Sequence, residues 1–129
     1  MHDPIADMIV RIKNASDSKK ESVVFPYSKL KFAILDCLAK EGFIKSFSKN
    51  GKKIVKFIEV FLAYENGSPK INGLERVSKT SKRVYFSAKE LRPVRNGFGR
   101  MILSTPKGIV TDVEARASVS GGEALFKIW

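Results

Sequence analysis

The strongest constraint on the fold is an Asn50-Gly51 dipeptide that separates two apolar segments, residues 43–47 and 54–62. Asn-Gly between two such segments is a strong signal for a β-hairpin. The second segment, IVKFIEVFL, is mostly apolar, which is typical of a strand with neighbours on both sides. We therefore predict a hairpin whose second strand lies at the centre of its sheet.

A helix is predicted to begin at Pro4. Asp3 can cap its first turn, and proline is favoured at the first helical position because no backbone N–H is needed there. Apolar residues then recur at positions 5, 8, 9 and 12, the spacing of one buried helix face. Residues 14–22 are polar and are predicted to form a loop.

A second helix is predicted between Ser28 and Glu41. A short apolar strand at 23–25 precedes it, Ser28 can cap it, and Gly42 can end it. Cys37 lies in the apolar band of this helix, so we expect it to be a small buried side chain. As the single cysteine of the chain, it cannot form an internal disulfide.

The second half of the chain is predicted to be mainly β. A polar segment at 65–70, ENGSPK, separates it from the first half. Thr111 and Glu114 have the spacing of a capping box, so one short helix is expected to start at Asp112. The expected strands cover residues 74–77, 83–86, 100–104 and 124–129, with a helical turn at 87–91 and a loop at 94–99.

These elements predict an α+β fold class. An N-terminal α/β lobe with the order helix, strand, helix, strand, strand is followed by a mainly β C-terminal lobe with one short helix. The expected domains are residues 1–64 and 71–129, joined by a linker at 65–70. With 129 residues, 43% of them hydrophobic, the chain can form one compact unit or two small lobes with a modest core.

The charge of the chain favours a polyanionic partner. Lys and Arg number 24 against 13 Asp and Glu, a formal net charge of +11, which destabilises a small compact state unless a partner neutralises it. Residues 76–107 carry nine of the basic groups and one acidic group, a local net charge of +8. Nucleic acid is therefore the leading partner.

The sequence indicates neither an enzyme nor a membrane protein. The single histidine, His2, lies near the chain end, and no Ser/His/Asp set, metal-binding cluster or glycine-rich nucleotide loop is present. The apolar run at 5–12 is too short and too charged for a signal peptide, and no run approaches about 18 apolar residues. We expect a cytoplasmic binding protein without metal or cofactor.

The stretch 103–123 is the candidate binding site. Ser104, Thr105, Lys107 and Gly108 place two hydroxyls, a cation and a flexible backbone in a turn between apolar runs. This combination suits contact with the phosphate and sugar oxygens of a nucleic acid. The free N–H groups at the start of the helix that follows could also face an anion.

Many short motifs along the chain occur in an order that resembles one known family. The motifs are Asp3-Pro4-Ile5-Ala6-Asp7-Met8, Arg11-Ile12-Lys13-Asn14-Ala15, Ser28-Lys29-Leu30-Lys31, Glu41-Gly42-Phe43-Ile44, Arg76-Val77-Ser78, Ser104-Thr105-Pro106-Lys107-Gly108, Thr111-Asp112, Glu114-Ala115-Arg116 and Gly121-Gly122-Glu123. In this series the chain closely resembles the bacterial small-subunit ribosomal proteins of the S-eight family. The match runs from Asp3 to Trp129.

The resemblance implies a function. Proteins of this family have an N-terminal α/β domain and a mainly β C-terminal domain. They bind the central domain of the small-subunit ribosomal RNA early in assembly, help to form the platform, and recognise an irregular RNA helix chiefly through the C-terminal domain. Neighbouring small-subunit ribosomal proteins are implied as further partners, and some members also repress their own operon by binding its messenger RNA.

The resemblance also implies which residues contact RNA. The expected contacts are Ser104, Thr105, Pro106, Lys107 and Gly108, with Tyr85, Gly122 and Glu123 beside them and with Pro4, Lys29 and Lys31 supporting from the N-terminal side. Pro106 departs from the family pattern, in which serine is common at this position. It removes a hydroxyl and a backbone N–H, so a third hydrogen bond from this loop is in doubt.

Specific roles follow from RNA chemistry. A regular RNA duplex hides its base edges, so recognition uses 2′-hydroxyls, shape and bases splayed out of the helix. We expect Ser104 and Thr105 to bond base or ribose edges, Lys107 to pair with phosphate, and Tyr85 to stack or pack on a sugar. Glu123 would accept from base amino groups and so discriminate between RNAs.

Other interpretations stay open at this point. Tyr85 could be half-buried sheet packing, and Glu123 a solubilising charge at a strand edge. The whole chain could instead be a basic RNA-binding regulator or chaperone outside the ribosome. A protein-interaction domain is a third class, but it leaves the charge of residues 76–107 unexplained.

Overall fold

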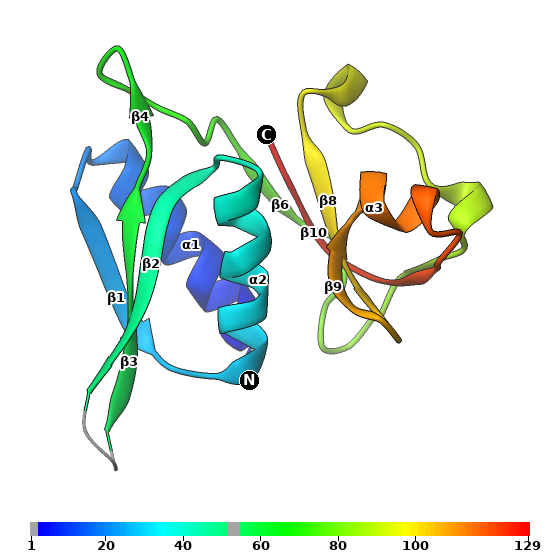
Figure 1. Ribbon diagram of the computed structural model, residues 1–129, viewed down its shortest axis with the longest axis horizontal. Coiled ribbons are helices and arrows are strands. Elements are labelled where there is room, and N and C mark those ends of the chain that lie inside the picture. Colours follow the sequence, from blue (N-terminus) through cyan, green and yellow to red (C-terminus); the bar gives the residue numbers. More distant parts are fainter. Residues whose placement is uncertain (1–2, 52–54) are drawn as a thin grey trace. The chain divides into compact units, whose positions relative to one another are not determined.

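The computed structural model describes residues 3–51 and 55–129 and divides the chain into two compact units (Figure 1). The N-terminal unit is Pro4–Ile71, and the C-terminal unit holds Asp3 together with Asn72–Trp129. The predicted α+β fold class is confirmed, because the first unit has the order helix, strand, helix, strand, strand and the second is mainly β. The expected domains at 1–64 and 71–129 stay a prediction.

The N-terminal unit is a three-stranded antiparallel sheet with two helices on one face (Figure 1). The sheet order is β1-β3-β2, so the apolar strand β3 is central, as predicted. Ile58 and Val60 of β3 are fully buried. The elements are α1 (Pro4–Asp17), β1 (Ser22–Pro26), α2 (Lys29–Lys40), β2 (Ile44–Gly51) and β3 (Lys56–Leu62).

The cap of α2 was predicted correctly, whereas the predicted end of α1 was wrong. The Ser28 side chain accepts a hydrogen bond from the backbone N–H of Lys31, and Cys37 is buried, as expected. Helix α1 continues to Asp17, four residues into the predicted loop at 14–22. Ala15 and Ser16 are buried there, and a Lys13–Asp17 ion pair of 2.7 Å joins successive turns on the outer side, so the polar sequence is still amphipathic.

The predicted hairpin is present, but its turn is not at Asn50-Gly51. These two residues end β2 and pair with Phe57 and Lys56 of β3. Gly51 is needed for close approach, because a Cβ there would lie 2.2 Å from the carbonyl oxygen of Val55. Ile54, the predicted start of the second strand, is outside the described residues.

A second Asn-Gly pair makes the tight turn of this unit. Asn66 and Gly67 have φ values of +52° and +80° and join β4 (Tyr64–Glu65) to β5 (Ser68–Pro69). Positive φ at both central residues is the geometry that Asn-Gly favours. The predicted linker at 65–70 thus contains most of a small β-ribbon.

The C-terminal unit is built around one long strand. This strand, β10 (Gly122–Ile128), pairs with β8 (Arg100–Thr105) on one side and with β6 (Leu74–Arg76) and β7 (Tyr85–Phe86) on the other. The Thr111–Glu114 capping box is present and starts α3 (Asp112–Ala117), as predicted. The remaining elements are the short 3-10 helices η1 (Ala88–Glu90) and η2 (Arg95–Gly97) and the strand β9 (Gly108–Thr111). The helical turn at η1 was predicted, whereas η2 lies in the predicted loop at 94–99 and β9 was not predicted.

One apolar cluster of this unit lies on the face of the sheet that α3 covers. Leu103 of β8 and Ala124 of β10 are partners in register and are fully buried. They belong to a buried cluster that also holds Leu91, Val94, Met101 and Ala115. Residues that alternate with Leu103 and Ala124 along the strands therefore point to the opposite face.

Two features are absent from the described residues. No helix there is long and apolar enough to cross a membrane. No group of three His, Cys, Asp or Glu side chains within 3–51 and 55–129 is placed to hold a metal ion.

Candidate nucleic-acid interface

Three of the predicted contact residues form one row across the sheet of the C-terminal unit. Glu123 on β10 pairs with Ser104 on β8 and, on its other side, with Tyr85 on β7. Directly paired residues of antiparallel strands project from the same face. This face is opposite to the Leu103 and Ala124 side. We call Tyr85, Glu123 and Ser104 the recognition row.

The side chains of the row differ in exposure. Tyr85 is 67% exposed, which rules out half-buried packing as its main role. Glu123 is on the central strand, so it is not a charge at a strand edge. Ser104 is partly exposed, and among the described residues its hydroxyl has no hydrogen-bond partner, which leaves it able to donate and accept.

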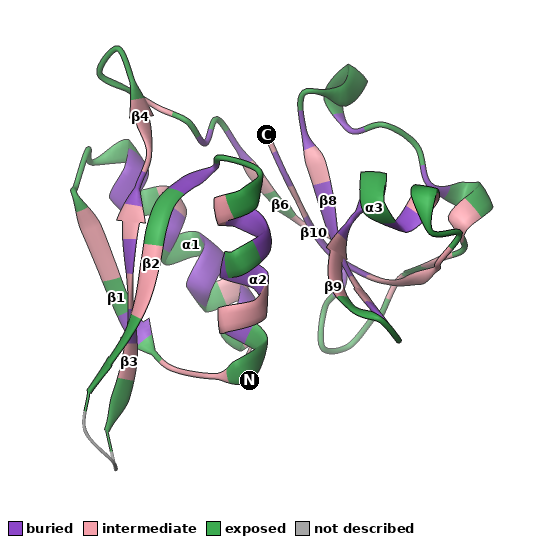
Figure 2. Ribbon diagram, in the orientation of Figure 1, coloured by how far each residue is buried: buried purple, intermediate pink, exposed green. Residues whose placement is uncertain are grey.

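The row ends at a tight turn. Thr105 pairs with Gly108, so Pro106 and Lys107 are the two central residues between β8 and β9. Neither has a positive φ, and Gly108 follows with φ +112°, as in a type I turn closed by a glycine bulge. Proline fits the first central position, because φ is near −65° there and the turn needs no N–H from this residue. Pro106, Lys107 and Gly108 are all exposed (Figure 2).

The Thr105 hydroxyl is used inside the turn. It donates to the carbonyl oxygen of Gly108 at 2.8 Å and accepts from the backbone N–H of Lys107 at 3.2 Å. The side chain is also buried, with 9% exposure for the residue. Thr105 therefore shapes the turn, whereas Ser104 presents the open hydroxyl beside it.

The acid of the row is paired with a cation that sequence reasoning did not single out. Nη1 of Arg83 lies 3.1 Å from Oε2 and 3.4 Å from Oε1 of Glu123. The Glu123 side chain is 14% exposed and that of Arg83 54%. Arg83 and Tyr85 are two residues apart on an extended segment, so both can lie on the Glu123 side. Only the strand register reveals this.

Two adjacent glycines allow the strands of the row to approach each other. A Cβ on Gly122 would lie 2.2 Å from the carbonyl oxygen of Ser104, and one on Gly121 would lie 2.6 Å from that of Phe86. Neither distance is possible between real atoms without movement of the backbone. Gly122, predicted as a contact residue, thus has a packing role that fixes Ser104 beside Glu123.

The predicted contacts of the N-terminal unit are less uniform. Pro4 and Lys29 are exposed at the starts of α1 and α2. Lys31 is buried, with 7% exposure, and its Nζ donates to the carbonyl oxygen of Pro26 at 3.3 Å. The same ammonium lies 5.7 Å from the centre of the Phe25 ring. Lys31 is therefore engaged within its own unit.

The sequence profile of the family described as ribosomal protein S8 matches residues 3–129. The chain belongs to this family. Three curated relatives are all named small ribosomal subunit protein uS8. That of Novosphingobium aromaticivorans is 44% identical over 100% of this chain and 98% of its own length. That of Caulobacter vibrioides is 46% identical with the same coverage, and that of Dictyoglomus thermophilum is 46% identical over 98% and 97%.

Membership of the ribosomal protein S8 family confirms the resemblance noted in the sequence. The family also confirms that the chain is a ribosomal protein and no enzyme, and a cytoplasmic location agrees with it. The individual contact residues are not identified by these similarities. Their roles in RNA binding stay a prediction.

Proposed function

We propose that this member of the ribosomal protein S8 family is a structural constituent of the small ribosomal subunit that binds ribosomal RNA directly. In this proposal it is a primary binder that recognises an irregular helix in the central domain of the small-subunit RNA and helps to assemble the platform. Neighbouring small-subunit proteins would be further partners, and an operon messenger RNA with a similar helix would compete for the same surface.

The observation that carries this proposal is the recognition row beside the exposed turn. A partly exposed hydroxyl, a shielded carboxylate and an exposed aromatic ring lie side by side on one sheet face. Such a set gives little attraction for phosphates, since its one charge is negative. It suits base edges and a base or ribose face that an irregular helix exposes.

Each residue of the surface then has a distinct task. Ser104 exchanges hydrogen bonds with a base edge or a 2′-hydroxyl, and Tyr85 stacks on a base or packs on a ribose. Glu123 accepts from a base amino group and penalises RNAs that lack one there. Lys107, exposed at the turn, pairs with phosphate. Thr105 acts indirectly by holding the turn.

The test compares the irregular rRNA helix with a fully paired duplex of equal length at fixed salt. We expect at least about a tenfold preference for the irregular helix, roughly 1.4 kcal/mol. Glu123→Gln and Ser104→Ala narrow this preference. Lys107→Ala weakens the binding of both RNAs alike. It also lowers the slope of log affinity against log salt concentration by about one, the value for one lost phosphate contact.

One control variant and one contradicting outcome complete the test. Lys20→Ala removes an exposed cation from the N-terminal unit and is matched in charge to Lys107→Ala. It should leave the affinity for both RNAs unchanged, whereas Lys107→Ala lowers both. Equal binding of both RNAs by the wild-type chain contradicts recognition by the row and leaves only general attraction of a basic protein for RNA.

A further inference from the structure

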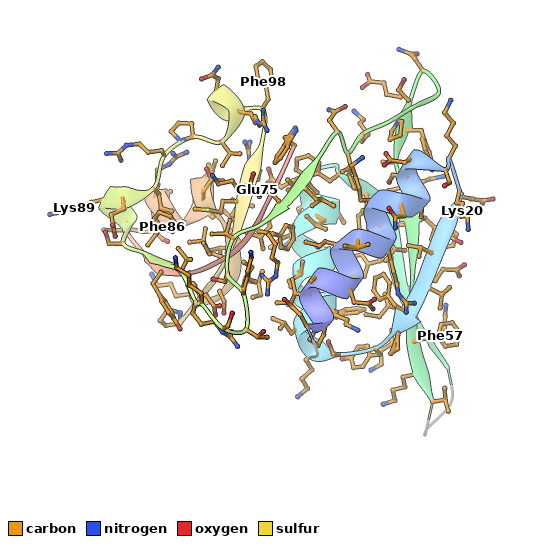
Figure 3. All side chains as sticks on the ribbon, turned by 180° about the vertical axis from the view of Figure 1, so that it is seen from behind. Lys20, Phe57, Glu75, Phe86, Lys89 and Phe98 are labelled. Carbon is orange, nitrogen blue, oxygen red and sulfur yellow. The ribbon has the colours of Figure 1, made fainter. Side chains whose placement is uncertain are left out.

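A second exposed aromatic residue lies at the other end of strand β8. Phe98 is 86% exposed, and Figure 3 shows it projecting from the loop that leads into β8. Three consecutive residues before it, Arg95, Asn96 and Gly97, have φ values of +50°, +55° and +94°. Positive φ is the geometry that Asn-Gly favours, whereas a left-handed conformation is unfavourable for arginine, so the backbone strain of this loop lies at Arg95.

Hydrogen bonds hold the strained loop in one conformation. The backbone N–H groups of Gly97 and Gly99 both donate to the carbonyl oxygen of Val94, at 3.0 Å each. Nη1 of Arg100 donates to the carbonyl oxygens of Gly97 and Gly99, at 2.9 and 2.8 Å. Phe98 is thus presented to solvent by a fixed support.

The surroundings of Phe98 are basic. The guanidinium of Arg95 stacks 4.0 Å from the centre of the Trp129 ring. Nη1 of Arg92 donates to the carbonyl oxygens of Lys89 and Leu91. Arg92 and Arg95 are exposed, and because a guanidinium has five N–H donors, each can also bind an external anion. No acidic residue occurs anywhere between positions 91 and 107.

A pocket lies next to this loop. It has a volume of about 400 Å³, in the range of small-molecule sites, and Arg92, Arg95 and Trp129 form part of its lining. Glu75 and Glu90 also line it. Lys127 lines it as well, so the pocket offers carboxylates that accept from the amino groups of a base beside cations that can face a phosphate.

We propose that Phe98, Arg92 and Arg95, with the adjoining pocket, form a second RNA-binding surface that takes an unpaired strand. The Phe98 ring stacks on one base, the two arginines contact the flanking phosphates, and the pocket admits the next base. Exposed aromatic rings combined with cations are how single strands are bound without a fixed sequence. An apolar protein partner would explain Phe98 but not the two exposed arginines, Arg92 and Arg95, of the same surface.

This surface is separate from the recognition row. Strand β8 runs from Arg100 to Thr105, so the Phe98 loop and the Thr105–Gly108 turn lie at its two ends. Six residues of strand span about 20 Å. One unit can therefore contact two RNA segments at once. The inference depends on Phe98 and its arginines and holds whether or not the row recognises an irregular helix.

The experiment measures binding of the full chain to an unpaired oligouridylate of about ten nucleotides, a length that such surfaces cover. Phe98→Ala is expected to lower the affinity at least about fivefold, which is the lower end of what loss of one stacking ring costs. Phe98→Trp should restore it. Phe98→Leu, which stays apolar but cannot stack, should behave like Phe98→Ala.

Matched variants separate this site from general effects. Val119→Ala removes another exposed apolar side chain of the same unit and should change nothing. Phe98→Ala should also leave the preference for the irregular helix over a duplex unchanged within about twofold. Wild-type affinity of Phe98→Ala, or of Phe98→Leu, overturns the proposal; the second result would mean that apolar contact and not stacking holds the RNA.

Discussion

Arg83 and Glu123 form an ion pair, 3.1 Å between Nη1 and Oε2, at the centre of the recognition row. The pair has two consequences. The carboxylate is held in one orientation, and its negative charge is partly neutralised before RNA arrives. A base amino group can then share the carboxylate, because a carboxylate accepts several hydrogen bonds at once.

The first prediction concerns this pair in RNA binding. Arg83→Ala should weaken binding of the irregular helix, because Glu123 is left to face RNA as an unoriented charge. In a double-mutant cycle with Glu123→Gln, we expect a coupling free energy of at least about 0.5 kcal/mol. Unfolding free energy should change by less than about 1 kcal/mol, since the Arg83 side chain is half exposed. Strictly additive effects on binding would show that the two residues act separately.

Gly122 should be intolerant of a side chain. In Gly122→Ala the new Cβ would meet the carbonyl oxygen of Ser104 at 2.2 Å, so β10 and β8 must separate. We expect a loss of about 1–3 kcal/mol in unfolding free energy, as for other overpacked sites. Urea unfolding followed by the fluorescence of Trp129, the single tryptophan, measures it.

Gly108→Ala provides the comparison for Gly122. No atom lies within 4 Å of a Cβ placed at Gly108, but its φ of +112° is unfavourable for alanine. Its cost should therefore come from backbone strain alone, about 1–2 kcal/mol. A Gly122→Ala chain as stable as the wild type would mean that the strands separate freely at this point.

Local signals in the sequence predicted much of the fold. The Ser28 cap and the Thr111–Glu114 capping box each join residues three positions apart, so both can be predicted from local sequence without knowledge of the fold. The turn of the first hairpin was predicted wrongly because an Asn-Gly pair does not by itself fix a turn: Asn50 and Gly51 pair with Phe57 and Lys56 as part of β2, whereas Asn66-Gly67 does join two paired strands. Strand β9 was not predicted because it is only four residues long and directly follows the Pro106-Lys107 turn, so the turn and the strand together have the sequence pattern of a single loop.

The candidate site was predictable in composition but not in arrangement. Ser104, Tyr85 and Glu123 could be named from the sequence, yet their row depends on strand register, which long-range packing sets. For the same reason the Arg83 partner of Glu123 was not foreseen. The internal use of the Thr105 hydroxyl likewise depends on the geometry of the turn.

Thr105 should influence RNA binding through the turn. Thr105→Val keeps the shape of the side chain but removes both hydrogen bonds of the hydroxyl, to the Gly108 carbonyl and from the Lys107 N–H. We expect it to lower stability by about 1–2 kcal/mol and to weaken RNA binding. Thr105→Ser keeps the hydroxyl and should retain most of the stability and most of the RNA affinity. If Thr105→Val bound RNA normally, the turn would not need this support.

Asp112 should matter for stability rather than for binding. Its buried Oδ1 accepts from the backbone N–H of Met101 at 3.1 Å, and Nη2 of Arg116 lies 3.6 Å from Oδ2. Asp112→Ala leaves that buried N–H without a partner, so we expect a loss of about 1–3 kcal/mol in unfolding free energy. Asp112→Asn keeps an acceptor and should cost less. Equal losses in urea unfolding would assign the effect to the charge and not to the hydrogen bond.

The last prediction is a pH dependence at the start of η1. The Ser87 backbone N–H, 2.8 Å from Oε1, and then the Ser87 side chain lower the pKa of Glu90 below its ordinary value of 4.5. Because the folded chain favours the carboxylate, this stabilisation is present above pH 4.5 and is lost as pH falls through the lower, folded-state pKa. Glu90→Gln should therefore be less stable than wild type at neutral pH and approach it in acid. Ala88→Gly, in the same turn and without a titrating group, should show a constant difference in urea unfolding, and a constant difference for Glu90→Gln would contradict the assignment.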